Sequence, residues 1–117
     1  MENIRITETG FDLLVGAKVK PKGSVVWNRI NSITAIKIAQ FDGEILGLEF
    51  EVPGEKQFFL VTDEVGGFDD LCNRLEMMFA VDTTWRSRLS NAEAGIPEIL
   101  WKTKTGQSEG ANVSRSQ

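Results

Sequence analysis

The 117-residue chain contains no histidine and a single cysteine, Cys72. Histidine is the usual proton carrier of catalysis near neutral pH and the commonest metal ligand, so its absence argues against most acid–base and metal chemistry. One cysteine cannot form an internal disulfide or supply the several thiolates of a structural zinc site. We therefore predict that the chain is not an enzyme and holds neither a metal nor a cofactor.

The sequence also lacks long apolar runs and an excess of positive charge. No run approaches the roughly 20 residues of a membrane-spanning helix, and the first residues alternate like a strand instead of resembling a secretory signal. Thirteen Lys and Arg against seventeen Asp and Glu leave a net charge of −4. We expect a soluble, cytoplasmic protein without a membrane span, and one that does not bind nucleic acid, because phosphate backbones attract basic surfaces.

Residues 2 to about 63 consist of short alternating runs separated by turns, which is typical of antiparallel strands. The clearest run places Phe11, Leu13 and Val15 on one face of a strand. Asp42-Gly43 is the strongest signal for a tight hairpin turn. The pattern predicts about six antiparallel strands joined by short turns.

The apolar period then changes from two to between three and four, which predicts an amphipathic helix over residues 65–79. The acidic pair Asp69-Asp70 falls in its first turn, where the helix dipole favours negative charge. Cys72 lies on the apolar stripe of the helix and is expected to be a buried small hydrophobe, not a nucleophile. Asp82 is expected to be the N-cap of a second, short helix that carries Trp85 and Leu89.

Residues 96–104 are apolar enough to rejoin the edge of the sheet or to cover the open end of a barrel. Residues 105–117 are mainly small and polar, so they cannot bury enough surface to offset the entropy of ordering. We therefore expect a single domain over residues 1–104 and a disordered tail over 105–117. Burial is the expectation for all three tryptophans, and one left exposed beside a charged face would be a candidate binding hot spot.

Three runs of the sequence carry a resemblance: Val26–Lys37 with its Trp27-x-x-Ile30-x-x-Ile33 spacing, Phe41–Phe50, and Gly67–Leu71, which opens the helix. In this order they resemble small bacterial proteins with a pleckstrin-homology-like domain, some of which are immunity proteins that neutralise toxins delivered between neighbouring cells. The resemblance implies an α+β fold, in which an antiparallel sheet or barrel of six to seven strands is capped by the helix. It also implies a protein partner, such as a basic toxin domain.

Negative charge is concentrated between Phe41 and Glu55, where the sequence has no Lys or Arg and five acidic residues: Asp42, Glu44, Glu49, Glu51 and Glu55. We expect Glu44, Glu49 and Glu51 to lie on the face of a strand opposite Leu46, Leu48 and Phe50. Such a face is suited to a basic partner, where charge supplies steering and specificity. The alternative is an ordinary solvated face that keeps the protein soluble.

A second candidate site is basic. Lys18, Lys20 and Lys22 cluster near the end of the second predicted strand. A basic loop of this kind could hold a lipid headgroup or phosphate, with about 1 kcal/mol for each lysine near an anionic membrane. The alternative is a solvated strand end in which lysines discourage pairing with other strands.

Overall fold

The computed structural model describes residues 2–15, 23–54 and 59–103, and within these ranges the chain is an α+β fold. Its strands are β1 (Glu2–Ile6), β2 (Gly10–Val15), β3 (Gly23–Val26), β4 (Ser32–Gln40), β5 (Gly43–Glu51), β6 (Phe59–Thr62) and β7 (Glu98–Lys102). The helices are a short 3-10 turn, η1 (Trp27–Arg29), and the α-helices α1 (Phe68–Phe79) and α2 (Trp85–Ser90).

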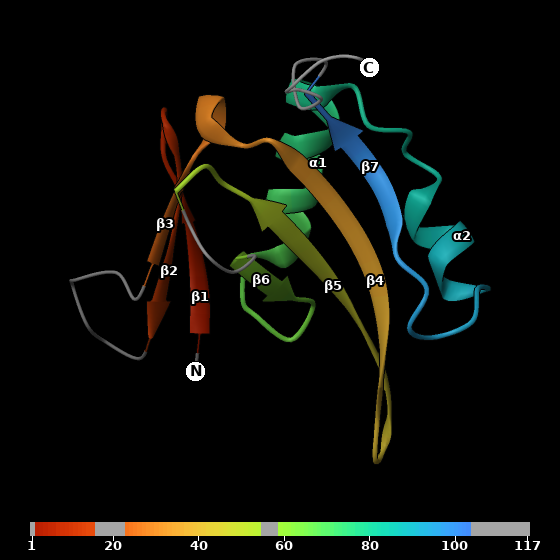
Figure 1. Cartoon of the computed structure of the whole chain (residues 1–117). Helices are drawn as coiled ribbons and strands as arrows, with labels where there is room; N and C mark the ends of the chain where they lie inside the picture. The colour runs from red at the N-terminus through yellow and green to blue at the C-terminus, as the bar shows by residue number, and fades with distance from the viewer. Residues whose placement is uncertain (1, 16–22, 55–58, 104–117) are drawn as a thin grey trace.

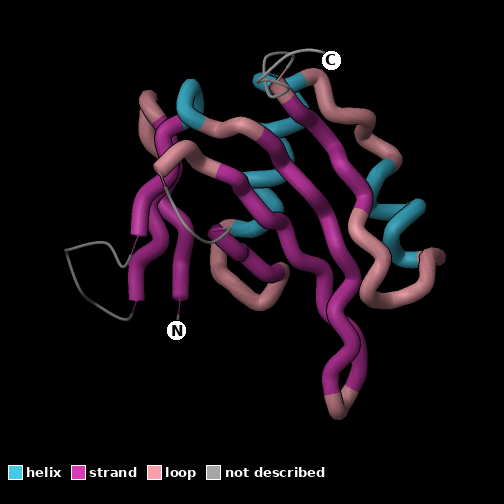
Figure 2. The backbone as a smooth tube through the Cα atoms, viewed as in Figure 1, coloured by secondary structure: helices cyan, strands magenta, loops and turns pink. Residues whose placement is uncertain are grey.

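The first three strands form an antiparallel sheet in the order β1-β2-β3 (Figures 1 and 2). As the alternation predicts, Phe11 and Leu13 of β2 are buried, and Val25 of β3 is buried beside them. On the opposite face, Arg5 forms an ion pair of 2.8 Å with Asp12. A hydrogen bond from Ser24 and the charge of Arg5 hold the pKa of Asp12 below its ordinary value. This sheet therefore has one core face and one polar face.

The other four strands form a second antiparallel sheet in the order β6-β5-β4-β7. Nine residues of β4 pair with nine of β5, from Ser32↔Glu51 to Gln40↔Gly43, and this long hairpin projects beyond the body of the molecule (Figure 2). Residues on one side of the hairpin are completely buried: Ile33, Ala35, Leu48 and Phe50. The hairpin that the Asp42-Gly43 signal predicts is confirmed, although the turn itself consists of Phe41 and Asp42.

Helix α1 lies behind β4 and β5 in the view of Figure 1 and buries its apolar stripe, Phe68, Leu71, Cys72 and Leu75. The predicted helix is thus confirmed, with a start three residues later than expected. It follows a backbone bridge in which Ile4 donates to the carbonyl of Gly66 and the amide of Gly66 donates to the carbonyl of Glu2, at 2.8 and 2.9 Å. This bridge joins the three-stranded sheet to the start of α1.

Helix α2 buries Trp85 and Leu89, as their spacing predicts, but its N-cap is Thr84 and not Asp82. The carboxylate of Asp82 instead accepts hydrogen bonds from the backbone amide and the hydroxyl of Thr84, at 2.9 and 2.8 Å. Both bonds lower the pKa of Asp82, and the bond from the backbone amide of Thr84 has the larger effect. Asp82 therefore stabilises the turn that leads into the helix.

Strand β7 pairs antiparallel with β4, so the C-terminal apolar segment rejoins the sheet edge, one of the two predicted positions. Trp101 stands opposite Ile33, and its ring packs on Phe79 of α1 with ring centres 4.7 Å apart. Trp27 and Trp85 are buried and Trp101 is partly buried, in agreement with the expectation for the three tryptophans.

The fold differs from the expected barrel. In the described ranges the seven strands form two open sheets of three and four strands, and no closed barrel is present. Between β3 and β4 the chain leaves the extended conformation at η1, where Trp27 is buried, and the strands on either side of this turn belong to different sheets. No helix in these ranges is long and apolar enough to cross a membrane. The predicted tail, residues 105–117, lies outside the described residues.

Because the two faces of the four-stranded sheet differ in burial, truncating a side chain on each face is expected to lower the free energy of unfolding by different amounts. Leu48→Ala removes a fully buried side chain and is expected to lower the free energy of unfolding by about 2–5 kcal/mol in urea denaturation. Leu60→Ala, at a β6 side chain that is 45% exposed, is expected to cost less than about 1 kcal/mol. Equal losses would contradict the assignment of one buried and one open face.

Candidate functional site

The β4–β5 hairpin has an inner face that packs on the core and an outer face that no described helix covers (Figure 1). We define the outer face by the outward-pointing residues of β4, β5 and β6. Its aliphatic members Ile36, Ile38 and Ile45 are only partly buried and do not belong to the core cluster. Leu60 of β6, opposite Glu49, is 45% exposed on the same side. The outer face is therefore a sheet surface with an apolar centre.

Two of the predicted acidic residues, Glu49 and Glu51, lie on the outer face. Glu51 is exposed and accepts a hydrogen bond of 3.2 Å from the hydroxyl of Ser32, its partner in the ladder. Glu49 is partly buried, and no ion pair to it occurs among the described residues. Ser32 pairs with Glu51 on one side and with Lys102 of the edge strand β7 on the other. Among the described residues, neither Glu49 nor Glu51 forms an ion pair.

In the described ranges, none of the other three residues of the predicted acidic site is found on the outer face with Glu49 and Glu51. Asp42 is exposed in the turn at the tip of the hairpin, and Glu55 lies outside the described residues. Glu44 does not share the face of Glu49 and Glu51, so that part of the prediction is wrong. It lies in the same row as Leu46, because alternation gives residues 44 and 46 the same side. It is also opposed by a cation, since its carboxylate is 3.4 Å from the ammonium of Lys37.

Lys37 is a structurally important residue that the sequence interpretation missed. Its side chain points to the inner face, is only 8% exposed, and donates a hydrogen bond of 2.8 Å to the carbonyl of Ser90. Ser90 is the last residue of α2, where unpaired carbonyls and the helix dipole favour a cation. The carbonyl of Lys37 in turn accepts from the amide of Gly95 at 2.8 Å. The hairpin is thus attached to α2 at this point.

The described arginines that form ion pairs do so away from the outer face. Arg88 pairs with Asp82 and Glu98, which raises the pKa of Arg88. Arg86 pairs with Asp69 at 2.9 Å and lies over the rings of Phe68 and Trp85. These arginines pair with carboxylates on the helical side of the molecule, and among the described residues no ion pair reaches Glu49 or Glu51.

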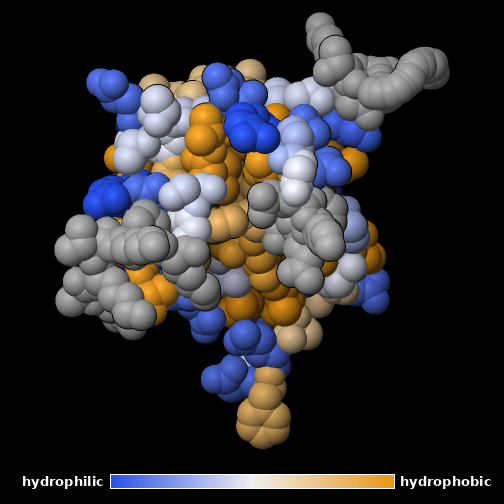
Figure 3. Space-filling model, turned by 60° about the vertical axis from the view of Figure 1, so that its left-hand side comes forward, coloured by the Kyte–Doolittle hydropathy of each residue, from blue (hydrophilic) through white to orange (hydrophobic). Residues whose placement is uncertain are grey.

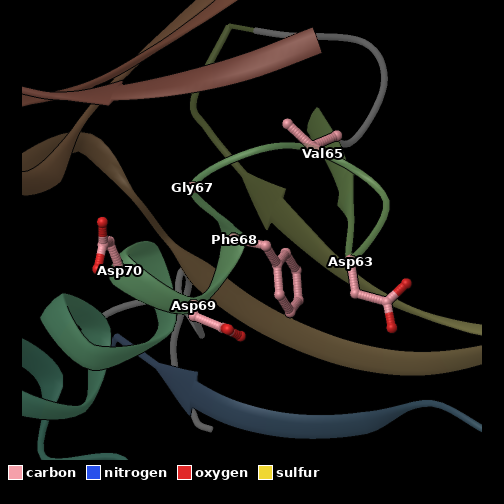
Figure 4. A pocket seen from close by; sticks show the side chains of 6 residues that line it. All are labelled: Asp63, Val65, Gly67, Phe68, Asp69 and Asp70. Atoms are coloured by element: carbon pink, nitrogen blue, oxygen red, sulfur yellow. The ribbon is translucent and has the colours of Figure 1, made fainter. Parts of the chain in front are cut away.

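A further group of acidic side chains surrounds the start of α1. A cavity of about 350 Å³ at the start of α1 is lined by Asp63, Val65, Gly67, Phe68, Asp69 and Asp70. Figure 4 shows the Phe68 ring between Asp63 and Asp69, with Asp70 pointing to the other side. In the described ranges no group of three or more potential ligands could hold a metal ion. Asp69-Asp70 does lie in the first turn of α1, as expected.

The basic candidate site, Lys18, Lys20 and Lys22, lies entirely outside the described residues.

The exposed aromatic side chain of the hairpin is Phe41 and not one of the tryptophans. Phe41 lies beside Asp42 in the turn, and its side chain is 108% exposed. A signal for it was present in the sequence, because a residue next to a predicted tight turn is expected to point into solvent.

A scan against protein-family models, a search of curated proteins and a search of solved structures each returned no match for this chain. The observations therefore support a small α+β protein with antiparallel sheets and identify no family. Its function has to be argued from the surface itself.

Burial predicts an unreactive thiol. Desolvation raises the pKa of Cys72 from 9.0 to about 11, so the reactive thiolate stays scarce in the folded chain until the pH approaches that value. We expect Ellman's reagent to modify Cys72 slowly in the native protein at mildly alkaline pH and at once in concentrated urea. Rapid modification of the native chain would show that the thiol is accessible and reactive.

The attachment of the hairpin to α2 can be tested at Lys37. Lys37→Met keeps the aliphatic stem but leaves the Ser90 carbonyl without its donor, which is expected to cost about 1–3 kcal/mol of unfolding free energy in urea denaturation. The matched control is Lys102→Met, which removes an exposed lysine on β7 and is expected to change stability by less than about 0.5 kcal/mol. Equal midpoints for the two variants would contradict the role given to Lys37.

Proposed function

We propose that the chain is a non-enzymatic binding protein whose outer face docks on the basic surface of a protein partner. The observation that carries the proposal is the composition of this face, in which carboxylates stand next to an open apolar centre. Glu49 and Glu51 supply the charge, and Ile36, Ile38 and Ile45 supply apolar surface. These three isoleucines are partly buried and lie outside the core cluster, so part of their apolar surface is open to a partner.

The two components have different physical roles in such a complex. Apolar side chains removed from water supply most of the affinity. The carboxylates accelerate encounter with a positively charged partner and select against acidic ones. A sheet face that combines apolar side chains with carboxylates is suited to covering a basic site on another protein.

The specific version of this proposal is a toxin-immunity protein, which would neutralise its cognate toxin by occluding a basic surface. Its supports are the resemblance in the Trp27–Ile33 and Gly67–Leu71 segments and the acidic outer face. A toxin that acts on nucleic acid needs a basic substrate site, and an acidic face can cover such a site. The inhibitor in this scheme requires no catalytic group.

The proposal predicts a charge-dependent complex with the product of the neighbouring reading frame. Glu49→Lys combined with Glu51→Lys is expected to reduce the association rate at low salt by about 10-fold or more, measured by surface plasmon resonance, because like charges then meet. The matched control is Asp70→Lys with Glu93→Lys, two exposed carboxylates elsewhere that change the net charge equally.

The control variant is expected to keep most of the wild-type rate. Equal losses of association rate in both variants would show that only the net charge matters. An unchanged complex after charge reversal at Glu49 and Glu51 would exclude the outer face as the binding surface. The absence of any complex, together with sedimentation on anionic vesicles, would instead favour the headgroup-binding alternative at Lys18, Lys20 and Lys22.

A further inference from the structure

Phe41 lies in the turn at the tip of the β4–β5 hairpin, which projects beyond the body of the molecule (Figure 2). The β4–β5 ladder continues to Gln40↔Gly43, and the tip extends away from both helices (Figures 1 and 2). Phe41 is 108% exposed, more than any other large hydrophobic side chain in the described ranges. No ring contact or cation–π contact of Phe41 occurs in these ranges. An aromatic ring of about 150–250 Å² thus stands free in water.

The fold gives no reason for an aromatic residue at this position. Phe41 and Asp42 both have negative φ, so the turn places no special demand on either side chain. The unusual backbone angle falls on Gly43, with a φ of +146°, where glycine is favoured. A polar residue at position 41 would satisfy the same turn without exposing apolar surface. The geometry of the turn therefore does not account for an aromatic side chain at position 41.

The tip continues into the apolar centre of the outer face. Ile38 and Ile45 face each other two residue pairs from the tip, and Ile36 pairs with Gly47 further along. A Cβ at Gly47 would lie 3.1 Å from the Cδ1 atoms of Ile38 and Leu60 and 3.6 Å from Cγ2 of Ile36, so these side chains converge over the glycine. Figure 3 shows a band of hydrophobic atoms that descends the centre of the view toward the projecting tip.

The charges around the tip define the partner. Asp42 is exposed beside Phe41 and forms no ion pair among the described residues, whereas Glu44 is 52% exposed but already paired with Lys37 at 3.4 Å. A pocket that accepts the ring must therefore tolerate or attract the Asp42 carboxylate at its rim. Anionic membranes repel these groups. A second copy of the chain offers, at its described cavity, Phe68 with Asp63, Asp69 and Asp70, which also repels them.

We propose that Phe41 is an anchor that inserts into an apolar pocket with a cationic rim on a protein partner, such as the mouth of a cleft that binds anionic substrates. This proposal rests on the proposed binding function of the outer face. It adds that the Phe41 ring is a main point of contact with the partner. The paired strands and the Lys37–Ser90 hydrogen bond hold the hairpin in one direction, so little conformational entropy is lost on insertion. Anchors of this kind carry a large share of binding free energy.

The first test is substitution of the anchor, measured by surface plasmon resonance against the product of the neighbouring reading frame. Phe41→Ser is expected to weaken binding by about 30-fold or more, mainly through faster dissociation. Phe41→Trp is expected to retain binding, because an aromatic ring still fills an apolar pocket. Met77→Ser, at a side chain that is 79% exposed on α1, is the matched control and should change nothing.

The outcomes separate this proposal from the one it rests on. Wild-type binding by Phe41→Ser, with binding lost on charge reversal at Glu49 and Glu51, would overturn the anchor and leave the outer face as the interface. Loss in Phe41→Ser with no effect of the charge reversal would place the interface at the tip alone and overturn the wider face. The Phe41 variants should fold, because Phe41 does not belong to the core cluster.

The second test distinguishes the possible occupants. Phe41→Cys labelled with a solvatochromic dye reports the surroundings of the tip, and buried Cys72 should stay unlabelled. We expect a blue shift of emission on addition of the partner, and none with mixed phosphatidylcholine–phosphatidylglycerol vesicles or with excess unlabelled chain. A shift with vesicles would assign the tip to membranes, and a shift with unlabelled chain would assign it to self-association; either result overturns the proposal.

Discussion

The antiparallel ladder between β4 and β5 is the constraint on which both the core and the candidate surface depend. Because side chains alternate strictly along paired strands, one row of the hairpin enters the core through Ile33 and Phe50. The other row has to face outward, and it carries Ile38, Ile45 and Glu49. The same ladder carries the chain past the helices to the tip. Core packing thus determines which residues an outside partner can reach.

A second constraint acts on the direction of the hairpin. The Lys37 ammonium bridges the end of α2 and Glu44, at 2.8 Å from the Ser90 carbonyl and 3.4 Å from the carboxylate. Desolvating a lysine is costly, and the helix dipole with its terminal carbonyl offsets part of that cost. One buried cation therefore neutralises a carboxylate, completes a helix end and orients the tip. It also explains why the acidity of the hairpin is concentrated at Asp42, Glu49 and Glu51.

Local patterns in the sequence predict those features that depend on residues close together in the chain, such as the buried face of a strand or helix. Alternation identified the buried face at Phe11 and Leu13, and helical spacing identified Leu71 and Leu75. The prediction that Glu44 shares a face with Glu49 and Glu51 is wrong, because alternation along β5 places residue 44 on the same side as Leu46. The arrangement of two open sheets could not be predicted, since it depends on contacts between distant residues, such as Ile4 with Gly66. The same holds for Lys37, whose partner Ser90 is 53 residues away.

The outer face and its tip are the surface proposed here for binding a partner. This proposal can be tested by isoleucine-methyl NMR with a soluble paramagnetic probe, in the free chain and with the product of the neighbouring reading frame. We expect strong broadening of Ile36, Ile38 and Ile45 in the free chain, in contrast to buried Ile33, and protection of these three methyls in the complex. Protection confined to Ile4 and Ile6 of the three-stranded sheet would contradict it.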